Sequence, residues 1–151
     1  MSQLSQAPKR LFLPTLGMLS ALAAMAMDMY LPSLPEIAQD LQTDYGHVQQ
    51  TLSVFLGGIA FSQLLYGPLS DRFGRRLVLL FGVSVFTLVS IFCALATDVN
   101  QLISMRLLQS LGAGAGSVVA AAVVRDLFQG AHAARVMSYV LMVMMVVPLI
   151  A

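Results

Sequence analysis

The chain has 151 residues, of which 58% are hydrophobic and 10% are charged, and its formal net charge is +1. An average soluble domain has about a quarter of its residues charged. The charges here are too few to cover the exterior of a soluble protein, so the composition indicates a protein that lies in lipid. The basic residues occur in ones and twos, which argues against a face that binds nucleic acid.

Four apolar stretches are long enough to cross a hydrocarbon layer of about 30 Å, which takes about 20 helical residues. They are residues 11–31, 48–69, 77–96 and 102–124, and a fifth apolar stretch covers residues 134–151. The segments between them are short and polar. The sequence therefore predicts an all-α integral membrane protein with four full transmembrane helices and most of a fifth.

The basic residues show a clear sidedness. If residues 1–10 form a cytoplasmic N-terminus, seven of the eight basic residues are cytoplasmic: Lys9, Arg10, Arg72, Arg75, Arg76, Arg125 and Arg135. The segments expected on the outer side hold carboxylates instead, namely Glu36, Asp40, Asp44 and Asp98. This distribution follows the positive-inside rule and predicts a multi-pass topology with the N-terminus inside.

A cleavable signal peptide is the alternative for the first helix. Lys9 and Arg10 precede an apolar run that contains the small-x-small pattern of residues 24–26. The run is longer than a usual signal core, and cleavage would remove a helix whose orientation fits all the later ones. We therefore expect the first stretch to remain as a transmembrane helix.

The turn between the second and third helices reads GPLSDRFGRR and covers residues 67–76. Its arginines, Arg72, Arg75 and Arg76, suit the inner face of a membrane without any further function. Gly74 supplies the backbone freedom that a tight turn needs. Gly67 has no side chain and would let another helix come close.

Asp71 in this turn is unusual, because a carboxylate at the end of a helix faces the unfavourable pole of the helix dipole. It therefore needs a partner. The sequence leaves three candidates: the N-terminus of the third helix, an arginine of this turn or Arg125, and a helix end elsewhere in the protein.

Two ionisable residues, Asp28 and Arg106, fall inside the expected membrane spans at similar depth, and such residues are functional candidates by default. Asp28 stands on a stripe of small residues, Gly17, Ala21 and Ala24. Burial disfavours its charged form and a nearby arginine favours it, so small rearrangements could change its protonation. The alternative is a wetted carboxylate that merely ends the helix before the outer joint.

Arg106 shares its helix face with polar and small residues, which indicates a side turned toward protein or water. These residues are Gln109, Ser110, Ala113 and Ser117. The alternative is an arginine that extends to the outer surface. Further along the same helix, Gly112 and Gly116 have the GxxxG spacing typical of close helix packing, with the lining of a substrate path as the alternative.

Other chemistry finds no support in the sequence. His47 and His132 lie far apart, with no metal-ligand spacing, and Cys93 is the only cysteine. No P-loop or Ser/His/Asp arrangement is present. We expect no metal, no cofactor and no enzymatic activity.

Three stretches resemble the major facilitator superfamily. The turn of residues 67–76 is similar to the family's signature loop, Gly-x-x-x-Asp-Arg-x-Gly-Arg-Arg/Lys. MDMYLPSLP, residues 27–35, resembles the end of the first helix in the drug-efflux branch that includes bicyclomycin and chloramphenicol resistance proteins. RLLQSLGAGAGSVVAAAVVRD, residues 106–126, resembles the fourth-helix motif of proton-coupled antiporters. The resemblance covers residues 11–151.

The resemblance implies the front part of a twelve-helix transporter, with residues 11–151 as an incomplete N-terminal six-helix bundle. The implied activity is proton-coupled efflux of small amphipathic drugs across the bacterial inner (plasma) membrane by alternating access. The implied partners are the drug, protons, lipid and the C-terminal half of the same protein. Two alternatives stay open: a proton-coupled uptake symporter, and a membrane scaffold subunit that does not transport.

The resemblance also implies residue roles. Asp28 and Arg106 would couple transport to protons, and Asp71, with Gly67, Arg72, Gly74, Arg75 and Arg76 of its loop, would act as a conformational latch to the other half. Arg125 and Asp126 would join a cytoplasmic charge cluster, for which simple interface charges are the alternative. Aromatic and methionine side chains could face a drug cavity, and the candidates are Met25, Tyr30, Phe55 and Phe61, with packing or lipid contact as the alternative.

Overall fold

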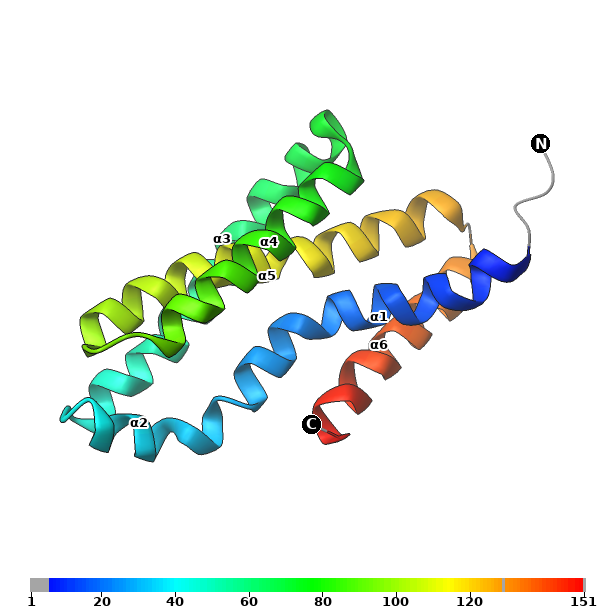
Figure 1. The fold of residues 1–151 in the computed structure, drawn as a ribbon. Helices are drawn as coiled ribbons and strands as arrows, with labels where there is room; N and C mark the ends of the chain where they lie inside the picture. The colour runs from blue at the N-terminus through cyan, green and yellow to red at the C-terminus, as the bar shows by residue number, and fades with distance from the viewer. Residues whose placement is uncertain (1–5, 129, 151) are drawn as a thin grey trace.

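The structure, a computed structural model, describes residues 6–128 and 130–150, with side chains described within residues 14–128, 130 and 132–146. The described chain is helical and has no strand (Figure 1). Its elements are α1 (Gln6–Asp28), the 3₁₀ turn η1 (Leu31–Ser33), α2 (Leu34–Asp40), α3 (Tyr45–Phe73), α4 (Arg75–Ala94), α5 (Val99–Leu127) and α6 (Ala131–Ile150).

Four helical segments are long and apolar enough to cross a membrane. They are Pro14–Asp40, Tyr45–Phe73, Arg75–Ala94 and Val99–Leu127, and a shorter apolar helix covers His132–Val146. The prediction of an all-α membrane protein with four full spans and part of a fifth is confirmed.

Local signals fix where these helices begin. The carboxylate of Asp44 accepts a hydrogen bond from the Gly46 amide at 2.9 Å, and Asp98 does the same for Asn100 at 3.2 Å. Each bond satisfies an amide that has no partner within its own helix, a type of cap that contributes about 1 kcal/mol. Gly74, with φ of +87°, is the only residue between α3 and α4, and glycine adopts this conformation without steric cost.

The joint after the first helix contains η1 and α2, which the sequence analysis did not predict. Prolines stand in the first turn of each, where their fixed φ favours a helix start. Leu34 is buried and packs against Tyr30, Val48 and Val99. This small apolar cluster explains why a polar joint folds back onto the bundle.

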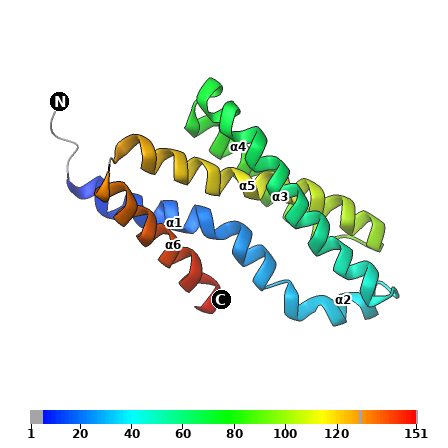
Figure 2. The same ribbon diagram turned by 180° about the vertical axis from the view of Figure 1, so that it is seen from behind.

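Helix α5 is the centre of the packing and contacts α1, α3, α4 and α6. Figures 1 and 2 show α5 beside α3 and α4 on one side, and α1 beside α6 on the other. The small residues of α5 allow these close approaches. A Cβ at Gly114 would clash with Ser62 of α3, one at Gly112 with the α4 backbone, and one at Gly116 with Leu19 of α1.

We expect Gly112→Ala to lower the free energy of unfolding by about 1–3 kcal/mol, as overpacking does elsewhere. The added methyl would lie 2.6 Å from the Gly82 carbonyl oxygen and the Phe86 amide nitrogen, and backbone cannot move aside cheaply. Gly57→Ala is the control, because nothing lies within 4 Å of its Cβ position. Thermal unfolding of the purified full-length protein in detergent measures both; equal stability of the two variants would contradict this packing.

Candidate functional site

The guanidinium of Arg106 is the centre of a buried polar cluster on α5. The residue is 7% exposed, and its Nη1 donates to Gln109 Oε1 at 3.0 Å and to the Ala26 carbonyl at 3.5 Å. The guanidinium carbon lies 3.6 Å from the Tyr30 ring centroid and 5.6 Å from that of Phe55. No carboxylate in the described part of the chain forms an ion pair with it, so amide dipoles and aromatic faces surround the charge.

The hydrogen bonds beyond Arg106 have a fixed direction. Ser90 donates to the Phe86 carbonyl at 2.7 Å, so its single proton is used and it accepts from Gln109 Nε2 at 2.7 Å. The Gln109 carbonyl is thereby turned toward Arg106, which can only donate. A chain of hydrogen bonds thus runs from Arg106 through Gln109 and Ser90 to the backbone of α4.

A cavity of about 650 Å³ opens beside this cluster, between α1, α2, α4 and α5. Its wall is mainly apolar, and Arg106, Gln109, Ser90 and Cys93 supply polar groups. Small-molecule sites have this size and this combination of an apolar wall with a few polar groups. Arg106 also keeps a buried Nε with no partner among the described residues.

The four candidates for a drug cavity have different surroundings. Met25 and Tyr30 line the cavity. Phe55 is 1% exposed and packs under the Arg106 guanidinium instead of on the cavity wall. Phe61 is 58% exposed on α3 and is not among the lining residues.

Asp28 does not meet Arg106 in this structure. It is the last residue of α1, it is exposed, and it is not among the residues that line the cavity. Gly17, at the start of the stripe of small residues that leads to it, faces α6, since a Cβ there would meet Val143. No contact between Asp28 and Arg106 occurs within the described chain.

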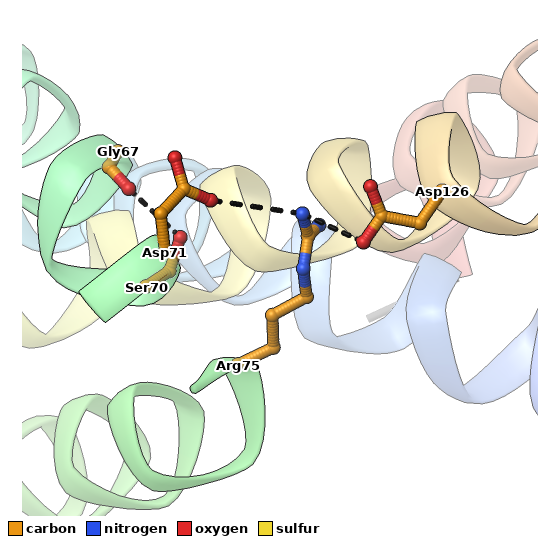
Figure 3. Close-up of polar contacts among 5 residues, drawn as sticks. All are labelled: Gly67, Ser70, Asp71, Arg75 and Asp126. Atoms are coloured by element: carbon orange, nitrogen blue, oxygen red, sulfur yellow. Dashed lines mark hydrogen bonds and ion pairs between the residues drawn. The ribbon is translucent and has the colours of Figure 1, made fainter. Parts of the chain in front are cut away.

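At the opposite end of α5, Arg75 joins two carboxylates (Figure 3). Its Nη2 lies 2.7 Å from Asp126 Oδ2 and 3.7 Å from Asp71 Oδ1. Of the three partners considered for Asp71, the structure shows an arginine of its own turn. The Asp71 side chain is 74% exposed and that of Asp126 is 54% exposed, so solvent screens both pairs and each contributes under about 1 kcal/mol.

Other members of the predicted loop and charge cluster lie outside this ion-pair network. Arg72, Arg76 and Arg125 are exposed, and Arg72 lies 5.5 Å from the Phe73 ring centroid. Gly67 has open space at its Cβ position, and its carbonyl accepts from Ser70 at 2.9 Å. One nitrogen of Arg75, Nη1, is buried with no partner in the described chain.

The sequence analysis missed two members of the cluster: Ser90, and Thr51, whose Oγ1 lies 2.8 Å from the Tyr30 hydroxyl. Each is one of several hydroxyl residues spread along an apolar helix. A hydroxyl there commonly bonds a carbonyl of its own helix, as Thr87 and Ser138 do. Position along the chain gave no sign that Ser90 also accepts from another helix.

Comparison with known proteins gives one family. The family model described as Major Facilitator Superfamily matches residues 16–151. The chain is 43% identical over 136 residues to the uncharacterised MFS-type transporter YdgK of Bacillus subtilis, which covers 90% of this chain and 34% of that protein.

Two further relatives carry resistance names. The chain is 40% identical over 141 residues to the bicyclomycin resistance protein homolog of Haemophilus influenzae, covering 93% of this chain and 35% of that protein. It is 36% identical over 136 residues to multidrug resistance protein D of Escherichia coli, covering 90% and 34%. The chain thus spans about a third of the length of the curated relatives it matches.

We expect Ser90→Ala to lower the free energy of unfolding by about 1 kcal/mol, because Gln109 Nε2 loses its buried acceptor. Thr87→Ala is the matched control on the same helix: its hydroxyl is exposed and donates only to the Val83 carbonyl. The control is expected to stay within about 0.5 kcal/mol of the parent. Unfolding of the full-length protein in detergent compares them, and an equal loss in both variants would rule out the inter-helix bond.

Proposed function

Because the chain belongs to the Major Facilitator Superfamily, we propose that it forms the first part of a proton-coupled exporter of small amphipathic drugs. The proposal concerns the whole transporter, since the chain covers about a third of its relatives. The resistance names of two of these relatives support export. The mechanism is alternating access in the bacterial inner membrane, with residues 1–10 cytoplasmic and rigid helix bundles rocking around a central site.

The buried guanidinium of Arg106 beside the cavity is the observation that carries the proposal. A charge inside a low-dielectric bundle strongly affects the ionisation of any group that comes near it. Arginine itself stays protonated, so Arg106 acts through its field and a different group carries the proton. That field extends into the cavity that we assign to the substrate. Proton binding and drug binding therefore both respond to the charge of Arg106.

Asp28 is the proposed proton carrier. It lies at the same end of the bundle as the Arg106 cluster, where α1 leads into Tyr30 and the cavity wall. Coupling requires that its surroundings change between the two states of the transporter. Exposure of Asp28 in one state and its burial in another would give that change, since burial disfavours the charged carboxylate.

The turn around Gly74 is the proposed latch. Arg75 holds Asp71 and Asp126 together at the cytoplasmic end of the bundle while one of its nitrogens stays unpaired among the described residues. The open space at Gly67 is suited to the approach of a helix from the other half of the transporter. Such a contact would stabilise one of the alternating states.

We expect Asp28→Asn to abolish proton-driven drug export from cells that carry the full-length gene, at equal membrane expression. The amide cannot bind and release the proton, whereas drug binding to the purified variant should persist. Glu36→Gln is the control, because Glu36 is an exposed carboxylate of α2 outside the cavity lining. Full export by the Asp28 variant would move the coupling elsewhere, and drug accumulation above the level of empty cells would indicate import.

We expect Gly67→Val to slow export at least tenfold while leaving the unfolding temperature within a few degrees of the parent. Beyond the adjoining backbone of α3, no atom of the described chain lies within 4 Å of the new Cβ, so a clash is expected only where another helix approaches. Gly57→Val tests a second open glycine on the same helix, away from the turn. Equal export rates for the two variants would argue against a latch at this turn.

A further inference from the structure

We propose that Tyr30 is the positioning residue for Arg106, holding the guanidinium with its ring and anchoring that ring to α3 through its hydroxyl. The role of Arg106 in transport rests on the proposed function above. The positioning itself rests on the contacts described next.

The Tyr30 ring is the nearer of the two aromatic rings beside the guanidinium. The distance of 3.6 Å between the Arg106 guanidinium carbon and the Tyr30 centroid is well inside the range of about 6 Å for a cation–π contact. Tyr30 and Arg106 are each 7% exposed, so both partners of this contact are largely buried. Phe55 lies farther away at 5.6 Å.

The hydroxyl of Tyr30 fixes the orientation of the ring. It lies 2.8 Å from Thr51 Oγ1, and the Thr51 proton is already donated to the Val48 carbonyl. Tyr30 is therefore the donor and Thr51 the acceptor. This bond ties the end of α1 to α3, and Thr51 itself is fully buried.

The backbone around Tyr30 is equally constrained. The Tyr30 amide donates to the Met27 carbonyl at 3.2 Å, and the Ser33 amide donates to the Tyr30 carbonyl at 3.1 Å. Beside the ring, Leu34 and Val48 pack in the same apolar cluster. The junction of α1, η1 and α3 thus fixes the ring against which the guanidinium packs, although Arg106 belongs to α5.

The test compares Tyr30→Leu with the parent in the full-length transporter, using protein labelled with ¹³C,¹⁵N-arginine. The Arg106 signal is identified by its disappearance in Arg106→Lys. A guanidinium over a ring has its resonances displaced by the ring current, and we expect Tyr30→Leu to move them toward the positions of exposed arginines such as Arg125. Tyr45→Leu is the control, because Tyr45 is 50% exposed at the start of α3, and it should leave the signal unmoved.

Two milder variants cover the case in which Tyr30→Leu does not fold. Tyr30→Phe keeps the ring and removes the anchor, and Thr51→Val removes the acceptor. Both should displace the Arg106 signal part of the way. An unmoved signal in both, or in a folded Tyr30→Leu, would overturn the proposal.

Drug export separates this inference from the proposed function. We expect Tyr30→Leu to reduce proton-driven export by the same factor as Arg106→Gln, and Tyr30→Phe to retain most of it. A displaced Arg106 signal with full export would leave the positioning by Tyr30 in place and overturn the role of Arg106 in transport. An unmoved signal with lost export would overturn the positioning alone.

Discussion

Burying the guanidinium of Arg106 is the constraint on which the arrangement of this bundle depends. A charge inside a membrane protein is costly unless polar groups surround it. The chain meets that cost without a carboxylate among its described residues, through an aromatic face from Tyr30, a carbonyl from α1 and the amide of Gln109. Ala26 and Tyr30 lie at or just after the end of α1, and Gln109 of α5 donates in turn to Ser90 of α4, so this cluster joins α1, α4 and α5 at one end of the bundle.

Close packing below Arg106 makes this convergence possible. The glycines and serines of α5 let α3 and α4 approach along its length, as with Gly114 against Ser62 and Gly112 against the α4 backbone. Van der Waals contact is the main attraction between helices in lipid, where apolar burial gives little advantage. The same helix therefore holds the bundle together by its smallest residues and organises the polar site by its largest.

Sequence reasoning succeeded where composition and spacing determine the outcome. A single arginine inside an apolar run and a glycine-rich stretch behind it identified α5 as the polar and packing helix. The partners of those residues depend on the rotation of neighbouring helices, and no local pattern encodes it. The sequence predicts similar membrane depth for Asp28 and Arg106, yet Asp28 is exposed whereas Arg106 is buried. The proton-coupling and latch roles stay predictions.

The single residue between α3 and α4 has a mechanical consequence. The Gly74 carbonyl already accepts from Val78, the first bond of α4, so only the two backbone torsions of one residue separate two long helices. Such a joint transmits displacement: α3 cannot slide along its axis without carrying the start of α4 with it. A change in the angle between the two helices therefore has to occur at or near Gly74, next to Arg75, whose guanidinium pairs with Asp126. The turn thus places the ion pair of Arg75 and Asp126 next to the point where the angle between α3 and α4 can change.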